Sequence, residues 1–352
     1  MDDPTISVVI PAFRSGSLIK ESINSVLSQT FQNFEIVIVD NNASLETRNV
    51  IQKMSILYPE KIRVIHEQKQ GNGSARNLGI RESRGEYIAL LDDDDLMYPQ
   101  RLEKQLNAIN QHPNAALVYC NLDCVSYDGQ TIMEKNKVER PGSWSRYLFG
   151  DSQRFKNDPL VEPRPSVIFF RKIRAIEAGL FDERFNPFWV EETEFYLRIW
   201  GLGPFIVIPE PLVAYRLPSL EFLNKKRTGN TNWLMAKRNL NLFFTILLEN
   251  YYCEGDNDIK KRFKKIQSQW LRELSLEVFR YHDGVRIGRG LLVRALQSNV
   301  MDLKNWKWYV RSFLPAQFLL KSLDCEKFAS ENLEEIAPSG TLDRLFQLPG
   351  DQ

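Results

Sequence analysis

The sequence contains few of the residues that build disulfide frameworks or imidazole-based sites, with only 4 cysteines and 3 histidines among 352 residues. Cys120 and Cys124 stand close together in a strand-like stretch, but no second cysteine pair has metal-ligand spacing. We therefore expect buried free thiols, which suit a reducing cytosol. The three histidines, His66, His112 and His282, lie far apart in sequence, which disfavours a histidine-based zinc site and a Ser-His-Asp triad.

Long apolar segments are also missing. No run reaches 18 apolar residues, and the longest candidate, "LNLFFTILLENYY", is interrupted by Asn241, Glu249 and Asn250. A membrane-spanning helix is therefore not expected. The opening stretch, "MDDPTISVVIP", is acidic and continues directly into a strand pattern, which is not typical of a signal peptide. These absences predict a cytoplasmic protein, with a peripheral position at the inner face of the membrane left open.

The charge is nearly balanced overall, at a formal net value of +1, but it is unevenly distributed. Residues 1–220 contain 25 basic and 29 acidic residues, residues 221–321 contain 19 and 9, and residues 322–352 contain 2 and 7. The first break follows "PEPLVAYRLPS", whose prolines disfavour a continuous helix or central strand. We predict a domain over 1–220, a basic helical region over 221–321, and an acidic, partly disordered tail over 322–352.

The first domain alternates apolar strand patterns with helical ones. Strands are predicted at "ISVVIPAF", "FEIVIVD", "KIRVIHE" and "YIALLD", and "AALVYCNLDCVSYDGQTI" predicts strand, turn and strand. Helices are predicted between them, the first with Ser17 as its N-cap. This order predicts an α/β fold with a mainly parallel sheet covered by helices on both faces.

Ligands of such sheets bind beyond the carboxyl ends of the strands, where residues 11–14, 40–42 and 92–95 are expected. A dinucleotide-binding oxidoreductase would place a Gly-x-Gly-x-x-Gly turn after the first strand, but "PAFRSGS" has one glycine. A nucleotidyltransferase would carry a glycine-rich basic loop there, and this turn offers only Arg14 and Gly16. Both classes are disfavoured.

Four consecutive aspartates, Asp92 to Asp95, follow the fourth predicted strand. Such a cluster is tolerated if some carboxyls protonate, if all are solvated, or if a divalent cation lies among them. A turn beginning at Asp93 would let Asp92 and Asp94 converge on one ligand. Hard cations such as Mg²⁺ or Mn²⁺ prefer oxygen ligands. The position at a strand end favours a metal and phosphate site over a solvated loop.

Five segments occur in the order and spacing of family 2 glycosyltransferases, which the chain resembles over residues 5 to 216. They are "ISVVIPAFRSGSLIKESINSVLSQTFQNFEIVIVDNNA", "GNGSARNLGI", "GEYIALLDDDDLMYPQRLEKQ", "AGLFDERF" and "EETEFYLR". The resemblance implies an inverting enzyme with the Rossmann-like GT-A fold. It also implies a nucleotide-sugar half over about 1–98 and an acceptor half over about 99–220.

The resemblance assigns nucleotide-sugar binding to several residues. Asp40 resembles the aspartate that accepts a hydrogen bond from the uracil imide; the alternative is a carboxylate that caps the following turn. Pro11 and Phe13 resemble the strand-end segment that packs round the base. Arg76 resembles an arginine near the diphosphate, while Asn77 and Gly79 would position its helix.

Asp92 and Asp94 match the Asp-x-Asp motif of the family. The match implies that Asp92 faces the ribose side and also borders the metal, while Asp94 binds the metal, Mn²⁺ or Mg²⁺, that bridges the diphosphate. Asp93 occupies the variable middle position and is expected to assist in nucleotide-sugar binding. Asp95 is expected to order the turn.

An inverting transfer needs a general base for the acceptor hydroxyl. The family supplies it from a Glu-Asp pair at the start of a helix, which "VEETEFYLR" matches. Glu192 stands in the position of the aspartate and is predicted to be the base, with Glu191 orienting the acceptor. The reverse assignment stays open. A third interpretation is that both glutamates only form an acidic first turn, which the helix dipole favours. Arg164 and Ser166 are further acceptor-side candidates.

The basic region over 221–321 is predicted to be helical. One apolar face is expected to consist of Phe263, Ile266, Trp270, Leu271, Leu274 and Val278. It either packs as a helical appendage or contacts an anionic membrane surface, which would suit a lipid-linked acceptor. No recognised nucleic-acid motif accompanies the charge, so a nucleic-acid partner is not expected.

The sequence thus predicts a metal-dependent inverting glycosyltransferase that moves a sugar, with a UDP-linked donor favoured, to an acceptor hydroxyl on a saccharide or lipid-linked molecule. Polysaccharide, glycolipid or glycan biosynthesis is the implied setting. The alternative is a sugar-nucleotide or membrane-surface binding protein that keeps the fold without turnover, which the exchange of aspartate for Glu192 motivates.

Overall fold

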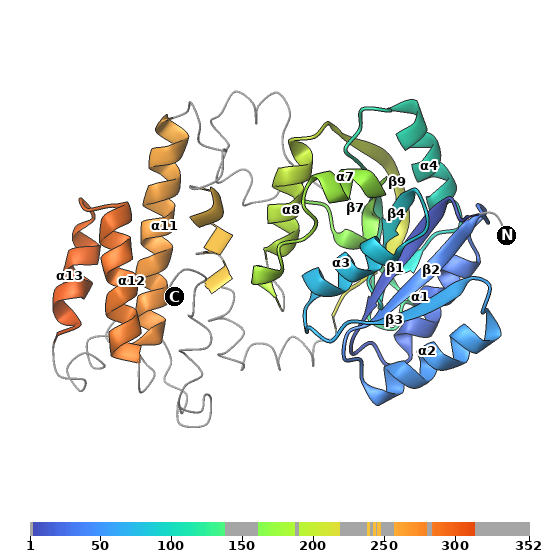
Figure 1. Ribbon diagram of the computed structural model, residues 1–352, viewed down its shortest axis with the longest axis horizontal. Coiled ribbons are helices and arrows are strands. Elements are labelled where there is room, and N and C mark those ends of the chain that lie inside the picture. Colours follow the sequence, from blue (N-terminus) through green and yellow to red (C-terminus); the bar gives the residue numbers. More distant parts are fainter. Residues whose placement is uncertain are drawn as a thin grey trace. The chain divides into compact units, whose positions relative to one another are not determined.

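The structure is a computed structural model that describes residues 3–137, 161–186, 190–218, 238–239, 242–243, 245–247, 257–279 and 284–313. The chain divides into two compact units, Met1–Leu220 and Glu221–Gln352. Figure 1 shows the α/β elements of the first unit and the helices of the second. The predicted acidic tail over 322–352 lies outside the described residues.

Four parallel strands form one half of the sheet in the first unit, in the order β3-β2-β1-β4. They are β1 (Ile6–Ala12), β2 (Phe34–Asp40), β3 (Ile62–His66) and β4 (Tyr87–Leu90), connected through α1 (Leu18–Leu27), α2 (Leu45–Leu57) and α3 (Asn72–Glu82). The central strands are continuously apolar because both of their faces are buried. The predicted alternation of strands and helices is confirmed.

The other half of the sheet is mixed. It continues from β4 through β8, β6, β9 and β5, and β7 pairs with the second half of β6, off this path. The strands are β5 (Leu96–Met97), β6 (Leu117–Val125), β7 (Ile132–Lys137), β8 (Ile168–Arg171) and β9 (Phe205–Arg216). Only β6 and β9 run parallel here; the β4–β8, β8–β6, β6–β7 and β5–β9 pairs are antiparallel. The helical elements of this half are α4 (Arg101–Gln111), η1 (Pro165–Val167), α7 (Lys172–Glu177), η2 (Glu183–Phe185) and α8 (Glu191–Trp200).

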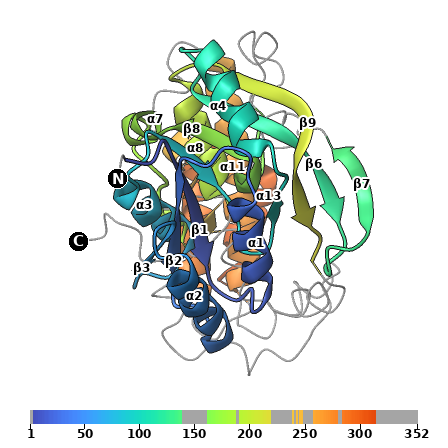
Figure 2. The same cartoon turned by 90° about the vertical axis from the view of Figure 1, so that its right-hand side faces the viewer.

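Helices cover both faces of the parallel strands. Figure 2 shows α3 on one side of β1 and β2 and α1 on the other. Helix α3 packs closely because Gly79 has no side chain: a Cβ there would lie 2.3 Å from Val9 Cγ1 and 3.1 Å from Val39 Cγ2. Gly79 therefore positions α3 against the strands, as expected from the sequence.

Two local details differ from the sequence prediction. Ser17 precedes α1 in a helical backbone conformation and makes no side-chain capping bond, so its predicted role as an N-cap is wrong. Cap side chains act from an extended conformation, which Ser17 does not adopt. For the two cysteines within the described residues the prediction is confirmed, since Cys120 and Cys124 are buried and form no disulfide.

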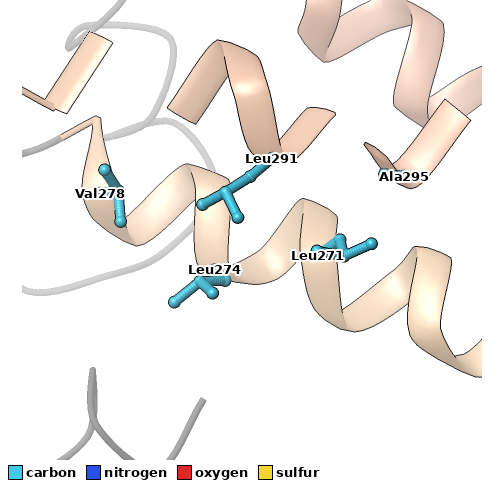
Figure 3. Close-up of a cluster of buried hydrophobic side chains, with 5 residues drawn as sticks. All are labelled: Leu271, Leu274, Val278, Leu291 and Ala295. Atoms are coloured by element: carbon cyan, nitrogen blue, oxygen red, sulfur yellow. The ribbon is translucent and has the colours of Figure 1, made fainter. Parts of the chain in front are cut away.

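The described part of the second unit contains α11 (Asn257–Val278), α12 (Gly284–Ser298) and α13 (Leu303–Arg311). Helices α11 and α12 bury a shared apolar cluster of Leu271, Leu274, Val278, Leu291 and Ala295 (Figure 3). A second cluster joins Phe279, Leu292 and Trp308 of α13. Within the described residues, no helix is long and apolar enough to cross a membrane.

Candidate active site

The carboxyl ends of β1, β2 and β4 lie side by side because these strands are parallel neighbours. Ala12 stands opposite Asp40 in the β1–β2 register, and Val9 stands opposite Leu90 in the β1–β4 register. The four aspartates begin two residues after the end of β4. The three predicted strand-end segments therefore meet at one edge of the sheet.

The aspartate turn is held to its surroundings mainly through its backbone. The Phe13 N–H donates to Asp93 Oδ2 at 2.9 Å, and Ser22 Oγ donates to the Asp93 carbonyl at 3.1 Å. The Asp92 N–H donates to Ser166 Oγ at 3.0 Å. Three separate segments thus fix the direction in which the aspartates point.

Asp95 is enclosed in the protein, unlike the three aspartates before it. It is fully buried, and its Oδ1 accepts a hydrogen bond from the Arg216 N–H of β9 at 2.9 Å. Its N–H closes the turn by donating to the Asp92 carbonyl at 3.2 Å. This geometry supports the expected ordering role of Asp95.

The remaining aspartates carry more negative charge than their surroundings balance. Burial, followed by repulsion from Asp93 and Asp92, raises the pKa of Asp94 to about 7. Burial also raises the pKa of Asp93 to about 6, although the hydrogen bond from Phe13 opposes that rise. The turn is therefore a place where added positive charge is favourable.

Arg76 of α3 connects this turn to the glutamate pair. Its side chain is 2% exposed; Nη2 donates to Asp92 Oδ1 and Nη1 to Glu192 Oε1, each at 3.1 Å. Nη1 also lies 3.5 Å from Glu191 Oε1. Burial alone would lower the pKa of this guanidinium, but the three carboxylates raise it above its ordinary value. Arg76 is therefore a permanent cation at the centre of the site.

The two glutamates at the start of α8 have different environments. The Glu191 side chain is 2% exposed, and its Oε2 has no hydrogen-bond partner within the described residues, while the Glu192 side chain is 33% exposed. Burial raises the pKa of Glu191 to about 8, and burial also raises the pKa of Glu192. Glu192 alone of the pair has substantial access to solvent.

The backbone before the pair is strained. Val190 has a φ of +73°, a left-handed conformation that a β-branched residue rarely adopts. Such strain costs about 1–3 kcal/mol and is held in place by the surrounding structure. Further along α8, Arg198 anchors the helix, since it pairs with Glu194 and donates to the carbonyls of Ala178 and Leu180.

Asp40 lies at the end of β2 with both carboxylate oxygens in use. Its Oδ1 accepts a hydrogen bond from the Ala43 N–H at 2.7 Å, and its Oδ2 accepts one from Arg48 Nε at 3.0 Å. Asp40 therefore caps the turn that follows β2, as the alternative interpretation expected. A carboxylate has about four acceptor positions, so further bonds remain available. Pro11 and Phe13 are half-buried on the adjacent strand, where the Arg14 guanidinium lies 4.6 Å from the Phe13 ring centre.

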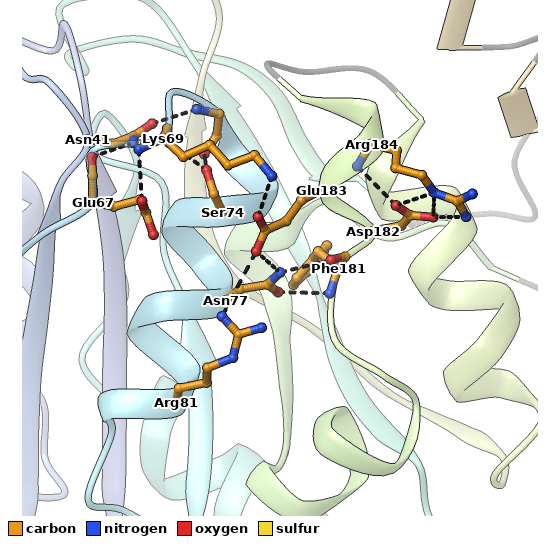
Figure 4. A network of polar contacts seen from close by, with 11 residues as sticks. Asn41, Glu67, Lys69, Ser74, Asn77, Arg81, Phe181, Asp182, Glu183 and Arg184 are labelled. Carbon is orange, nitrogen blue, oxygen red and sulfur yellow. Dashed lines mark hydrogen bonds and ion pairs between the residues drawn. The ribbon is translucent and has the colours of Figure 1, made fainter. Parts of the chain in front are cut away.

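A polar network that the sequence did not reveal joins α3 to the segment before α8 (Figure 4). Asn77 Nδ2 donates to the Phe181 carbonyl, and the Phe181 N–H donates to Asn77 Oδ1, both at 2.8 Å. Asn77 Nδ2 also donates to Glu183 Oε1 at 3.0 Å. The Phe181 ring centre lies 5.6 Å from Cζ of Arg76. The motif Ala-Arg-Asn therefore supplies the central cation, Arg76, and also Asn77, which holds Phe181 beside that cation.

Replacing Asn77 with alanine is expected to lower the free energy of unfolding by about 2–4 kcal/mol, because two buried backbone groups of Phe181 lose their partner. Urea unfolding measures this change. Asn33→Ala is the matched control, since the Asn33 side chain is exposed and, among the described residues, bonds Thr5 alone. Its effect should stay within about 0.5 kcal/mol. Equal effects of the two substitutions would contradict the structural role of Asn77.

Ser166 and Arg164, the acceptor-side candidates, have different surroundings. Ser166 is fully buried and accepts the hydrogen bond of the Asp92 N–H, so it supports the aspartate turn. The Arg164 guanidinium lies 4.6 Å from the Tyr215 ring centre. The structure thus brings Arg76, Asp92, Glu191 and Glu192 into direct contact, while Asp40 contacts a separate set of residues.

Solved structures identify the fold. The chain superposes on *Staphylococcus aureus* TarS 1-349 in complex with UDP with a TM-score of 0.52 at 15% identity, covering 94% of each chain. It superposes on the mannosyltransferase PcManGT of *Pyrobaculum calidifontis*, solved with GDP-Man and Mn²⁺, with a TM-score of 0.53 at 15% identity, covering 93% of this chain and 87% of that one. The expected GT-A fold with C-terminal helices is confirmed.

Sequence relatives name the family. A model of glycosyl transferase family 2 matches residues 7–176. An uncharacterized glycosyltransferase of *Rickettsia typhi* is 32% identical over 282 residues, covering 74% of this chain and 80% of the relative. The chain belongs to glycosyltransferase family 2. It spans only 22% of the length of a *Rickettsia felis* relative, which is 35% identical over 151 residues.

Proposed function

We propose that the protein is an inverting, metal-dependent glycosyltransferase that moves a sugar from a nucleotide-sugar donor, with UDP favoured, to an acceptor hydroxyl. The observation that carries this proposal is the contact of Arg76 with Asp92, Glu191 and Glu192 at the strand ends. It brings together residues that could bind a diphosphate and a group that can accept a proton. Family membership supports the reaction class.

The aspartate turn fits a divalent cation, Mn²⁺ or Mg²⁺. Asp92 and Asp94 offer carboxylate oxygens, and the raised pKa of Asp94 indicates unbalanced negative charge. Within the described residues, no group of three or more His, Cys, Asp or Glu side chains could hold a metal alone. Two protein carboxylates, Asp92 and Asp94, suit a cation that takes its other ligands from substrate phosphates. When bound, the cation would stabilise charge on the departing nucleoside diphosphate.

Arg76 would contribute fixed positive charge beside the diphosphate and hold Asp92 in place. Asp93, bonded to the Phe13 N–H, would keep the first strand end against the aspartate turn. Asp40 would accept a hydrogen bond from the base, and Pro11 and Phe13 would pack round it. Related folds bind different nucleotides: TarS was solved with UDP-GlcNAc and PcManGT with GDP-Man.

Glu192 would act as the general base. Its exposed fraction lets it reach an acceptor hydroxyl, and its raised pKa makes it a better proton acceptor at neutral pH than an ordinary glutamate. Glu191, expected from the sequence to orient the acceptor, is buried against Arg76. It would therefore act on the acceptor indirectly, by holding Arg76 and Glu192 in position. For Glu192 to take a proton freely, its ion pair with Arg76 must loosen, and a diphosphate that competes for the arginine would have that effect.

The donor can be identified by thermal shift. With Mn²⁺ present, the cognate nucleotide sugar is expected to raise the melting temperature, because a ligand that binds only the folded state stabilises it. UDP-sugars and GDP-sugars should be compared, with and without Mn²⁺. A UDP-sugar shift that disappears without the cation is the expected result; shifts with GDP-sugars alone would overturn the UDP assignment.

We further propose that residues 1–220 hold the transfer machinery and that 221–321 form a basic helical region. A saccharide or lipid-linked acceptor is the proposed partner. A peripheral membrane contact through the basic region would bring the enzyme to a lipid-linked acceptor. Polysaccharide or glycolipid synthesis is the setting that would use such a reaction.

The alternative, a binding protein without turnover, is motivated by Glu192 in the place of aspartate. Hydrolysis of the donor by the wild-type protein, lost in Glu192→Gln, would exclude it. Donor binding without hydrolysis or transfer would favour it.

A further inference from the structure

The outward face of α13 is unusually apolar. Leu303, Trp306, Val310 and Phe313 recur at helical spacing and are all exposed, with Leu303 at 81% and Val310 at 65%. Val300 and Met301, just before the helix, are exposed as well. We call these six residues the α13 stripe. A surface helix normally turns its apolar side chains toward the core, so an apolar face that points outward is unusual.

The α13 stripe is not the face by which α13 packs against the other helices. Trp308 and Asn305 occupy the opposite side of α13 and are buried, with Trp308 packed against Phe279 and Leu292. Asn305 Nδ2 donates to Ser268 Oγ of α11 at 2.7 Å, which fixes the rotation of the helix. Helix α13 is therefore docked by one face and presents another apolar face outward.

Basic side chains lie beside the stripe. Lys304, Lys307 and Arg311 also recur at helical spacing, next to the apolar residues, and the two lysines are exposed. Asp302 is the only acidic residue between 299 and 313. It caps α13 through the Lys304 N–H and pairs with Arg272 at 2.7 Å, so its charge is already compensated. The outward surface of α13 thus combines apolar side chains with cationic ones.

We propose that the α13 stripe inserts into the surface of an anionic lipid bilayer, with Lys304, Lys307 and Arg311 at the headgroup level. Apolar and aromatic side chains flanked by cations are the composition that binds such interfaces. The aromatic members suit the boundary, where their rings sit between headgroups and acyl chains. This assigns the peripheral contact proposed above to one helix and does not depend on the transfer chemistry.

Vesicle co-sedimentation of the full chain tests the proposal. Vesicles of phosphatidylcholine alone are compared with vesicles in which about a third of the lipid is phosphatidylglycerol. The wild-type protein is expected to bind the anionic vesicles more tightly, and added salt should weaken that binding. Leu303→Ser combined with Val310→Ser should weaken binding about 100-fold, since each buried aliphatic side chain accounts for about tenfold.

Matched variants separate the contributions. Lys304→Gln with Lys307→Gln should weaken binding about tenfold or more and reduce its salt dependence. Ile56→Ser with Leu57→Ser, two exposed apolar residues of α2 at 70% and 67%, should leave binding unchanged. Failure of wild type to sediment, or unchanged binding by the Leu303/Val310 variant, would overturn the proposal.

Two further readouts complete the test. Light scattering would reveal whether the stripe instead joins two copies of the chain; a loss of dimer in the Leu303/Val310 variant without a change in vesicle binding would also overturn the proposal. Donor hydrolysis in solution is measured in parallel and should be unaffected by the stripe variants. Vesicle binding without any hydrolysis would contradict the proposed transfer function and leave the lipid contact standing.

Discussion

Asp94→Asn is expected to reduce sugar transfer about 100- to 1000-fold, the usual effect of losing one electrostatic group in an active site, and to stabilise the cation-free protein. The first effect follows if Asp94 binds the cation. The second follows from the raised pKa of Asp94, about 7, which burial and the charges of Asp93 and Asp92 produce. Asparagine removes that repulsion while keeping nearly the same shape.

The stabilisation should depend on pH. A carboxyl whose pKa is higher in the folded protein stabilises the fold when protonated; this contribution is complete below the unfolded value of about 4 and is lost as pH rises through the folded value. The wild-type protein without cation should therefore lose stability between about pH 4 and 7. Asp94→Asn should lose less, so its advantage should reach at least about 1 kcal/mol above pH 7.

Urea unfolding across this pH range, with a chelator or with Mn²⁺, measures both effects. Asp3→Asn at an exposed position is the control and should change neither stability nor transfer. Mn²⁺ should raise the stability of wild type more at high pH, because protons compete with it, and should have little effect on Asp94→Asn. Normal transfer and unchanged Mn²⁺-dependent donor binding by Asp94→Asn would disprove the assignment.

Glu192→Gln is expected to reduce transfer about 100- to 10,000-fold while leaving donor binding intact, since a positioned general base contributes about that factor. Glutamine keeps the size of the side chain and can still bond Arg76 through its carbonyl oxygen. Glu192→Asp restores the commoner residue of the family at a shorter reach, so it should retain part of the activity.

Glu191→Gln distinguishes the two glutamates. Glu191 is buried against Arg76, so its replacement should weaken the orientation of the pair and lower the rate without removing its dependence on the ionisation of Glu192. Comparing the pH–rate profiles of the two variants locates the base. The pKa of the base appears as the low-pH limb of the profile, where the rate rises with pH. If Glu192→Gln keeps its rate and this limb while Glu191→Gln loses both, the assignments are reversed.

The parallel half of the sheet could be predicted from local sequence patterns, and so could an acidic site at the ends of its strands. Continuous runs of β-branched residues predict β1 and β2, because strands buried on both faces need no polar alternation. Parallel strands end at a common edge, so Asp40 and the aspartate turn could be assigned to one region. The family followed from motifs of this kind.

Other features depended on contacts between distant parts of the chain. Strand β9 pairs with β6 and β5, and periodicity does not show which strands become neighbours or in which direction they run. Asn77 bonds Phe181 across 104 positions, and nothing local to either residue indicates the other. The strained turn at Val190 is likewise a result of packing.

The sequence by itself therefore determined the class of enzyme, the acidic strand end and the glutamate pair, since these rest on residue type and spacing along one element. Only the tertiary structure decided that Arg76 bonds Asp92 and Glu192 at once, that Glu191 is the buried member of the pair, and that α13 turns an apolar stripe outward. Periodicity identifies an apolar face, but whether that face is buried or exposed depends on which of its neighbours the fold places against it.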